Sequence, residues 1–88
     1  MEENRTAEEN RIALIGIIAS SNECAEKVNA VLHDYGDYIV GRLGLPYREK
    51  NLNVISIVVD APASVINSLT GKLGMIECVS AKALYSGN

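Results

Sequence analysis

Few side chains in this sequence are of the kinds that perform catalysis or bind metals, and those few are far apart. His33 is the single histidine, and the two cysteines, Cys24 and Cys78, belong to no C-x-x-C pair. Imidazole-containing metal sites recruit several ligands, and a nucleophilic centre needs a base at a suitable spacing. We therefore predict no metal site, no cofactor and no catalytic residues. His33 is interpreted as a solvated surface residue, and both cysteines as reduced thiols that pack as small apolar groups.

A better candidate for binding is the pair Tyr47-Arg48, which follows Pro46 in a polar connection. A proline-fixed aromatic residue beside a cation can hold a small anion or contact a partner, although a solvated hairpin loop has the same composition. Arg42 comes a few residues earlier, within an expected strand. It either deters aggregation at a sheet edge or pairs across a subunit boundary. We predict that Arg42, Tyr47 and Arg48 form an interface along one sheet edge.

The remaining polar signals have structural explanations. Asp34 and Asp37 flank a turn, and Asp60 is suited to cap the helix that follows it. Gly71-Lys72 lacks the upstream glycine and the following Ser or Thr of a phosphate-binding loop. None of these residues is assigned a functional role.

The elements that position the candidate residues alternate between strands and helices. Residues 12–18 and 54–59 are rich in β-branched side chains and apolar on both alternating faces, which predicts two strands covered on both sides. Residues 38–45 and 76–85 complete a set of four strands. Apolar residues at helical spacing predict one helix that begins at a capping box, Ser20 to Glu23, and stops at a left-handed Gly36. A second helix is predicted over about 61–73.

The order β-α-β-β-α-β is that of an α+β, ferredoxin-like fold. Right-handed crossovers place both helices on one face of a four-stranded antiparallel sheet with strand order 4-1-3-2. No helix remains to cover the opposite face, yet the two central strands offer apolar side chains to both sides. An exposed face of this kind marks an interface. We therefore expect a homodimer or a homotetramer, formed through the open face, the edge strands, or both.

Length and charge limit the other classes of function. Eighty-eight residues make one small domain, which we assign to residues 11–88, behind a mobile acidic tail at residues 1–10. The net charge of −3 lies entirely in that tail, because residues 11–88 hold seven acidic and seven basic side chains. A neutral body has no electrostatic drive toward nucleic acid or anionic lipid. We predict no direct nucleic-acid partner, no membrane association and a cytoplasmic location.

Three segments of the chain resemble a known family of small proteins, the iron-only hydrogenase system regulators. These segments are YGDYIVGRLGLPYR at 35–48, VISIVVDAP at 54–62 and LTGKLG at 69–74. The resemblance implies a ferredoxin-like fold related to ACT domains and to the C-terminal domain of the nickel-responsive regulator. That regulator uses several histidines and a separate DNA-binding domain, whereas this chain has His33 alone and a short acidic start. We therefore expect neither nickel sensing nor DNA binding, and any regulation has to act through another protein.

The relation to ACT domains also implies a place for a ligand. ACT domains bind effectors at subunit interfaces, near the loop after the first strand and the start of the first helix. The matching residues are Ala19, Ser20, Ser21 and Asn22, where free helix amides favour a carboxylate. The expected function is that of a non-enzymatic regulatory module that binds a small-molecule effector or a regulatory protein. The rival interpretation is a ligand-free scaffold or assembly protein, and a small enzyme has the least support.

Overall fold

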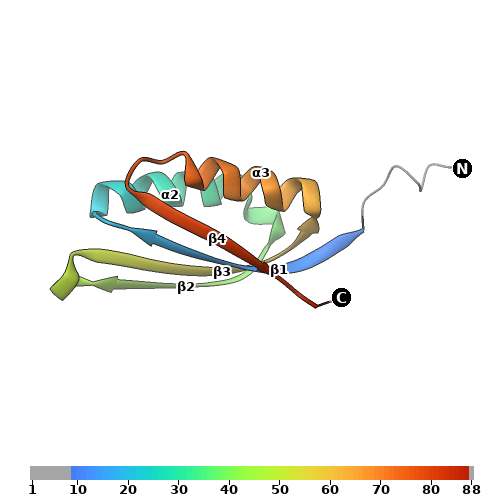
Figure 1. The fold of residues 1–88 in the computed structure, drawn as a ribbon, viewed down its shortest axis with the longest axis horizontal. Coiled ribbons are helices and arrows are strands. Elements are labelled where there is room, and N and C mark those ends of the chain that lie inside the picture. Colours follow the sequence, from blue (N-terminus) through green and yellow to red (C-terminus); the bar gives the residue numbers. More distant parts are fainter. Residues whose placement is uncertain (1–8, 88) are drawn as a thin grey trace, which may run out of the picture.

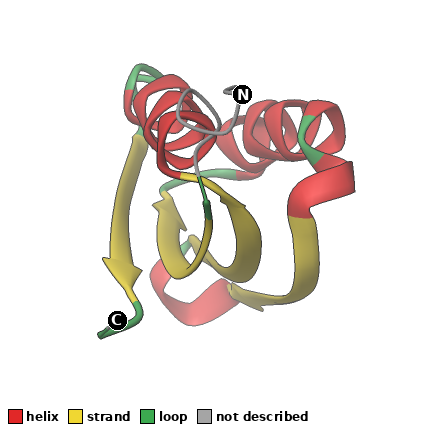
Figure 2. Ribbon diagram, turned by 90° about the vertical axis from the view of Figure 1, so that its right-hand side faces the viewer, coloured by secondary structure: helices red, strands yellow, loops and turns green. Residues whose placement is uncertain are grey.

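The computed structural model describes residues 9–87, which form a four-stranded antiparallel sheet and two helices. The sheet order is β2-β3-β1-β4, the predicted order read from the other edge. Both helices lie on the same face of the sheet (Figures 1 and 2). The elements are β1 (Asn10–Ala19), α2 (Asn22–Asp34), β2 (Ile39–Tyr47), β3 (Leu52–Pro62), α3 (Ala63–Gly74) and β4 (Val79–Tyr85), with 3-10 turns at Gly36–Tyr38 and Arg48–Lys50.

The core lies between the sheet and the helices and is entirely aliphatic apart from one cysteine. Alternate residues of β1 and β3 point toward the helices, and Ile15 of β1 pairs with Ile57 of β3 at the centre. Both side chains have no exposed surface, and burial of such a side chain stabilises the fold by about 1.5–3 kcal/mol. The helices contribute the remaining buried side chains, which are Cys24, Val28, Leu32, Ile66, Leu69 and Leu73.

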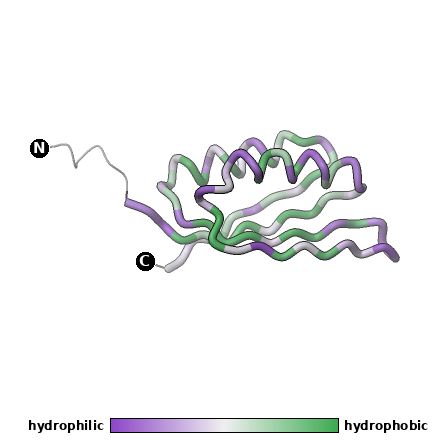
Figure 3. Tube along the Cα trace, turned by 180° about the vertical axis from the view of Figure 1, so that it is seen from behind, coloured by the Kyte–Doolittle hydropathy of each residue, from purple (hydrophilic) through white to green (hydrophobic). Residues whose placement is uncertain are grey.

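The opposite face of the sheet carries no helix, as the sequence predicts. The intervening residues of β1, among them Ile12, Leu14 and Ile18, are each more than 40 % exposed. Figure 3 shows hydrophobic residues along the central strands and hydrophilic residues at the tip of the β2–β3 hairpin. We call the surface on this side of the four strands the open face.

Several local predictions are wrong by a small displacement along the chain. The N-cap of α2 is Ser21 instead of Ser20, and its hydroxyl oxygen accepts a hydrogen bond of 3.1 Å from the amide of Cys24. Gly36 does not adopt a left-handed conformation. Asp60 does not cap the second helix, because β3 continues to Pro62 and α3 begins only at Ala63. Pairing with β1 extends this strand past the point where the local sequence predicts a helix.

The sheet begins within the segment that the sequence analysis assigns to the N-terminal tail. Asn10, assigned to the acidic tail, already belongs to β1 and pairs with Pro62. Residues 1–8 of the predicted tail lie outside the described residues.

The two cysteines are joined in a disulfide, contrary to the prediction of reduced thiols. Cys24 lies in the first turn of α2, and Cys78 immediately precedes β4. Their Cα atoms are 6.0 Å apart, within the usual range for a disulfide. The bond links helix α2 to the segment that leads into the edge strand β4.

Candidate ligand-binding site

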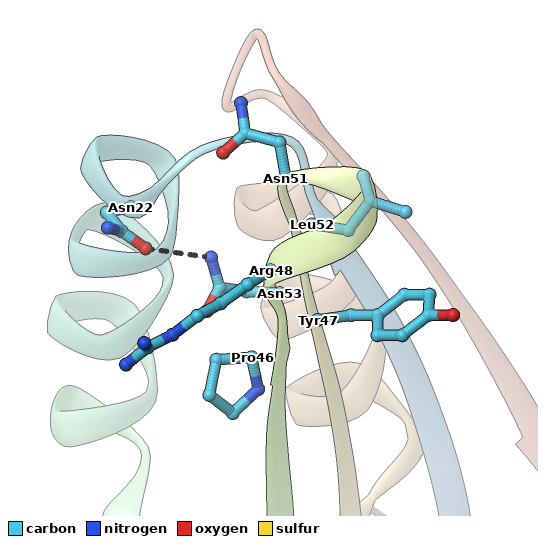
Figure 4. Close-up of a pocket in the computed structure, with 7 residues that line it drawn as sticks. All are labelled: Asn22, Pro46, Tyr47, Arg48, Asn51, Leu52 and Asn53. Carbon is cyan, nitrogen blue, oxygen red and sulfur yellow. Dashed lines mark hydrogen bonds between the residues drawn. The ribbon is translucent and has the colours of Figure 1, made fainter.

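A cavity of about 180 Å³ lies between the start of α2 and the tip of the β2–β3 hairpin. Figure 4 shows its walls: Asn22 from the helix on one side, and residues 46–48 and 51–53 from the hairpin on the other. The cavity therefore joins two segments that the sequence analysis had selected separately. The lining residues are Asn22, Pro46, Tyr47, Arg48, Asn51, Leu52 and Asn53.

Strand pairing brings these distant segments together. Ala19, the last residue of β1, pairs with Asn53 near the start of β3, so the hairpin tip lies beside the loop that leads into α2. The Asn53 side-chain amide donates hydrogen bonds to the Ser21 carbonyl oxygen at 3.4 Å and to Asn22 Oδ1 at 3.2 Å (Figure 4). Asn53 therefore holds the hairpin against the first turn of the helix.

Asn51 shapes the turn at the tip of the hairpin. Its φ of 57° lies in the left-handed region, which Asn adopts more readily than most residues. The Asn51 amide donates a hydrogen bond of 3.1 Å to the carbonyl oxygen of Arg48 and so closes the short 3-10 turn. This turn fixes the backbone from which Arg48 extends.

The structure gives the four residues of the predicted ligand segment different environments. Ala19 is fully buried, and Ser20 donates hydrogen bonds from its amide and its hydroxyl to the Cys78 carbonyl oxygen. The Ser21 hydroxyl caps α2 and also donates to the sulfur of Cys24 at 3.0 Å. Only Asn22 lines the cavity. A ligand-binding role for this segment stays a prediction, with Asn22 as the residue best placed to contact a ligand.

The predicted interface residues do not share one side of the hairpin. Arg42 points toward the helices and donates a hydrogen bond of 2.8 Å from its guanidinium to Asn29 Oδ1 of α2. Arg48 also extends toward α2, whereas Tyr47 points to the opposite side of the hairpin (Figure 4). The Tyr47 hydroxyl donates to a Glu49 carboxylate oxygen at 3.3 Å. The three residues thus stay candidates for an interface. Because they lie on opposite sides of the hairpin, the Tyr47 ring and the two arginines would contact different surfaces of a partner.

The chemistry that this cavity can perform is binding. The Arg48 guanidinium is an exposed cation with several donors, and the Asn22 and Asn53 side chains add amide donors and acceptors. The amides of Asn22 and Glu23 precede the amide that Ser21 caps and have no acceptor within the helix, which favours an anionic group nearby. Such a set of groups suits a small polar ligand with a carboxylate or a similar anion.

No metal centre is evident in the described part of the chain, where no three His, Cys, Asp or Glu side chains cluster. His33 lies exposed near the end of α2, as predicted.

Helices long and apolar enough to cross a membrane are absent from residues 9–87.

Sequence reasoning missed Asn51 and Asn53. The predicted topology contains the signal that could have identified Asn53. The first and third strands are predicted to pair antiparallel, which places the start of the third strand beside the end of the first. Residues that follow the hairpin turn then have to face the loop before α2. The prediction treated these residues only as a polar connection.

Comparison with known proteins supports the fold and identifies the family. An uncharacterized protein from Thermotoga maritima, TM1266, has a solved structure that superposes with a TM-score of 0.85 at 32% sequence identity, over 89% of this chain and 99% of that one. Two more distant structures share the fold. The ACT domain of the GTP pyrophosphokinase of Chlorobium tepidum superposes with a TM-score of 0.73 at 14% identity, over 85% of this chain and 99% of that one. The C-terminal domain of the MgtC protein of Mycobacterium tuberculosis gives 0.71 at 10% identity, over 91% and 92%.

Among curated proteins, none matches the chain. The sequence profile that does match is that of the TM1266-like family, described as "Iron-only hydrogenase system regulator, putative", and it covers residues 11–83. This range includes both helices and all four strands, except the first residue of β1 and the last two residues of β4. The chain therefore belongs to the TM1266-like family and has the ACT-like, ferredoxin-like fold.

Proposed function

We propose that this protein is a non-enzymatic regulatory module of an iron-only hydrogenase system, and that it binds a small anionic effector in the cavity between α2 and the β2–β3 hairpin. The family description supports the regulatory role, and the ACT-like fold supports effector binding. The single observation that carries the site is the convergence of Asn22 and Arg48 on one cavity, because each belongs to a segment selected independently from the sequence.

The hairpin offers a route from the ligand to a partner. An effector that binds Arg48 would hold the hairpin tip against α2, and the free edge of β2 would present that ordered hairpin to a second subunit or to a regulatory protein. ACT-like binding at a subunit interface is the arrangement proposed here. A ligand-free scaffold is the second candidate, and the apolar open face is the observation that favours it.

Ligand-dependent thermal stability separates the two candidates. Free amino acids, nucleotides and metal ions are each added to the purified protein, and the melting temperature is measured. A ligand that binds only the folded state at 100 times its Kd stabilises it by about 2.7 kcal/mol. We expect a carboxylate-bearing amino acid to raise the melting temperature, and Arg48→Ala to abolish the shift.

Lys50→Ala is the matched control, because Lys50 is an exposed cation of the same 3-10 turn and does not line the cavity. It should keep the shift. A shift that survives in Arg48→Ala would place the ligand elsewhere, and no shift with any probe would favour the scaffold.

The proposal includes a cytoplasmic location, which the low cysteine content of the sequence supports. There, the glutathione and thioredoxin systems would set the fraction of molecules that carry the Cys24–Cys78 bond. Alkylation of free thiols in rapidly quenched cells, followed by mass spectrometry, measures that fraction.

A further inference from the structure

The open face is largely apolar. The paired residues of the strands form rows that run across the open face. Most positions in these rows carry aliphatic side chains. Leu43 of β2 and Leu84 of β4 are each 69% exposed, and both central strands contribute further members. The exposed aliphatic residues on this face are Ile12, Leu14, Ile18, Leu43, Leu45, Val54 and Leu84.

Two charged residues interrupt this face, and they have opposite signs. Within the described strands, Asp60 of β3 and Lys82 of β4 are the only charged residues at open-face positions. Both are exposed, and neither makes an ion pair or a side-chain hydrogen bond within the described part of the chain. Asp60 is also free of the helix-capping role that its position in the sequence predicts. Among the described residues, these two charges have no partner within one copy of the protein.

Their positions are related through Leu14. Lys82 pairs across the sheet with Gly16, and Asp60 pairs with Ile12. Gly16 and Ile12 lie two residues to either side of Leu14 on β1, and β4 and β3 lie on opposite sides of that strand. Leu14 is thus midway between the two charges on the open face.

We propose that a second copy of this chain covers the open face, packed about a two-fold axis over Leu14, with Lys82 of each copy against Asp60 of the other. The axis lies between the open faces of the two copies and runs perpendicular to the line from Lys82 to Asp60. Rotation by 180° about it places Lys82 of one copy opposite Asp60 of the other. The two leucines at position 14 then meet on the axis. A two-fold interface has to be self-complementary. The placement of one cation and one anion on opposite sides of Leu14 makes the open face complementary to a second copy of itself.

The shape and size of the face agree with a second copy. A hollow of about 390 Å³ lies beside Lys82, floored by Gly16 and walled by Ile18 and Val54, and it can receive an aliphatic side chain. Four strands at about 4.8 Å spacing and about 3.4 Å per residue over seven residues give a flat footprint of roughly 450 Å². Over two copies this footprint is about 900 Å², and side-chain relief increases the buried area toward the lower end of the range for specific interfaces.

Charge reversal and mixing test the inference. Lys82→Glu places two Glu–Asp contacts in each homodimer, and Asp60→Lys places two Lys–Lys contacts there. Like charges that face each other across an interface weaken it strongly, so the Kd of each variant alone should rise by roughly tenfold or more. An equal mixture of the two variants pairs opposite charges at both contacts and should recover the dimer. Native mass spectrometry identifies the mixed species by its mass, and sedimentation velocity measures the dissociation.

Matched controls carry the same charge changes on the helical layer. Glu26→Lys and Lys27→Glu alter exposed residues of α2 and should leave the dimer intact. Thermal unfolding of every variant establishes that it is folded. A wild-type monomer at micromolar concentration overturns the proposal. So does a dimer that neither reversal weakens, or a mixture of the two variants that forms no more dimer than each variant alone.

Discussion

Arg42 in the edge strand β2 donates a hydrogen bond of 2.8 Å to the side-chain oxygen of Asn29 in α2. This contact links one edge strand of the sheet directly to helix α2. Both residues are exposed. The sequence suggests that Arg42 either protects the sheet edge from aggregation or contacts a partner. The hydrogen bond gives a third explanation, a contact within the same chain.

Arg42→Ala should lower the free energy of unfolding by about 0.5–1 kcal/mol, because exposed hydrogen bonds contribute little after the exchange with water. Asn29→Ala should cost a similar amount, and the double variant should cost little more than either alone. Urea denaturation of the three proteins measures the coupling. Strictly additive costs would mean that the two side chains do not interact in solution.

The two faces of β1 should respond very differently to a buried charge. Ile15→Lys places an ammonium group in the closed core and should remove more than about 4 kcal/mol of stability, so that the chain fails to fold. Ile18→Lys lies on the open face at 46 % exposure within one copy, so it should leave the chain folded and weaken only the proposed dimer. Circular dichroism during thermal unfolding measures both. A folded Ile15→Lys variant would contradict the assignment of faces.

The cap of α2 should be sensitive at Ser21 and much less so at Ser20. Ser21→Ala removes the acceptor for the Cys24 amide and should cost about 1 kcal/mol, the usual value for an N-cap. Ser20→Ala serves as the control, since the Ser20 backbone amide keeps its bond to Cys78 after the hydroxyl is lost. Chemical denaturation distinguishes them. A larger cost at Ser20 than at Ser21 would place the cap where the sequence alone predicts it.

Reduction of the Cys24–Cys78 bond should destabilise the protein. The two cysteines are 54 residues apart in the sequence, and the chain-entropy treatment of a loop of that length gives about 4 kcal/mol. Guanidinium unfolding with and without dithiothreitol measures the difference. A double variant, Cys24→Ala with Cys78→Ala, is the control and should show no response to the reductant. An unchanged midpoint for the wild type would show that the bond is not formed in solution.

The order and packing of the elements could be predicted because they depend on patterns a few residues long. Residues 12–18 and 54–59 are aliphatic except for Gly16 and Ser56, and this pattern indicates a strand that is covered on both faces. Local patterns failed where pairing between distant strands decides the outcome. The local sequence predicts that a helix starts at Pro62. Pairing with Asn10 keeps Pro62 in β3 instead, and Asp60 therefore lies on the open face.

The candidate site was predictable in part for the same reason. Asn22 and Arg48 could be chosen by residue type and by their places in the chain. Their contact with one cavity depends on the register that sets Ala19 against Asn53, which no local signal contains. The meeting of Cys24 and Cys78 likewise depends on the packing of α2 beside the start of β4.

The disulfide also determines what a single backbone cut can do. With Cys24 and Cys78 joined, the chain between them is a covalent ring that contains most of α2, all of α3 and the whole β2–β3 hairpin. The exposed turn at Arg48–Lys50 is the part of that ring most open to proteases with a preference for basic residues. A molecule nicked there remains one covalent species while oxidised, and after reduction it runs as two fragments under denaturing conditions.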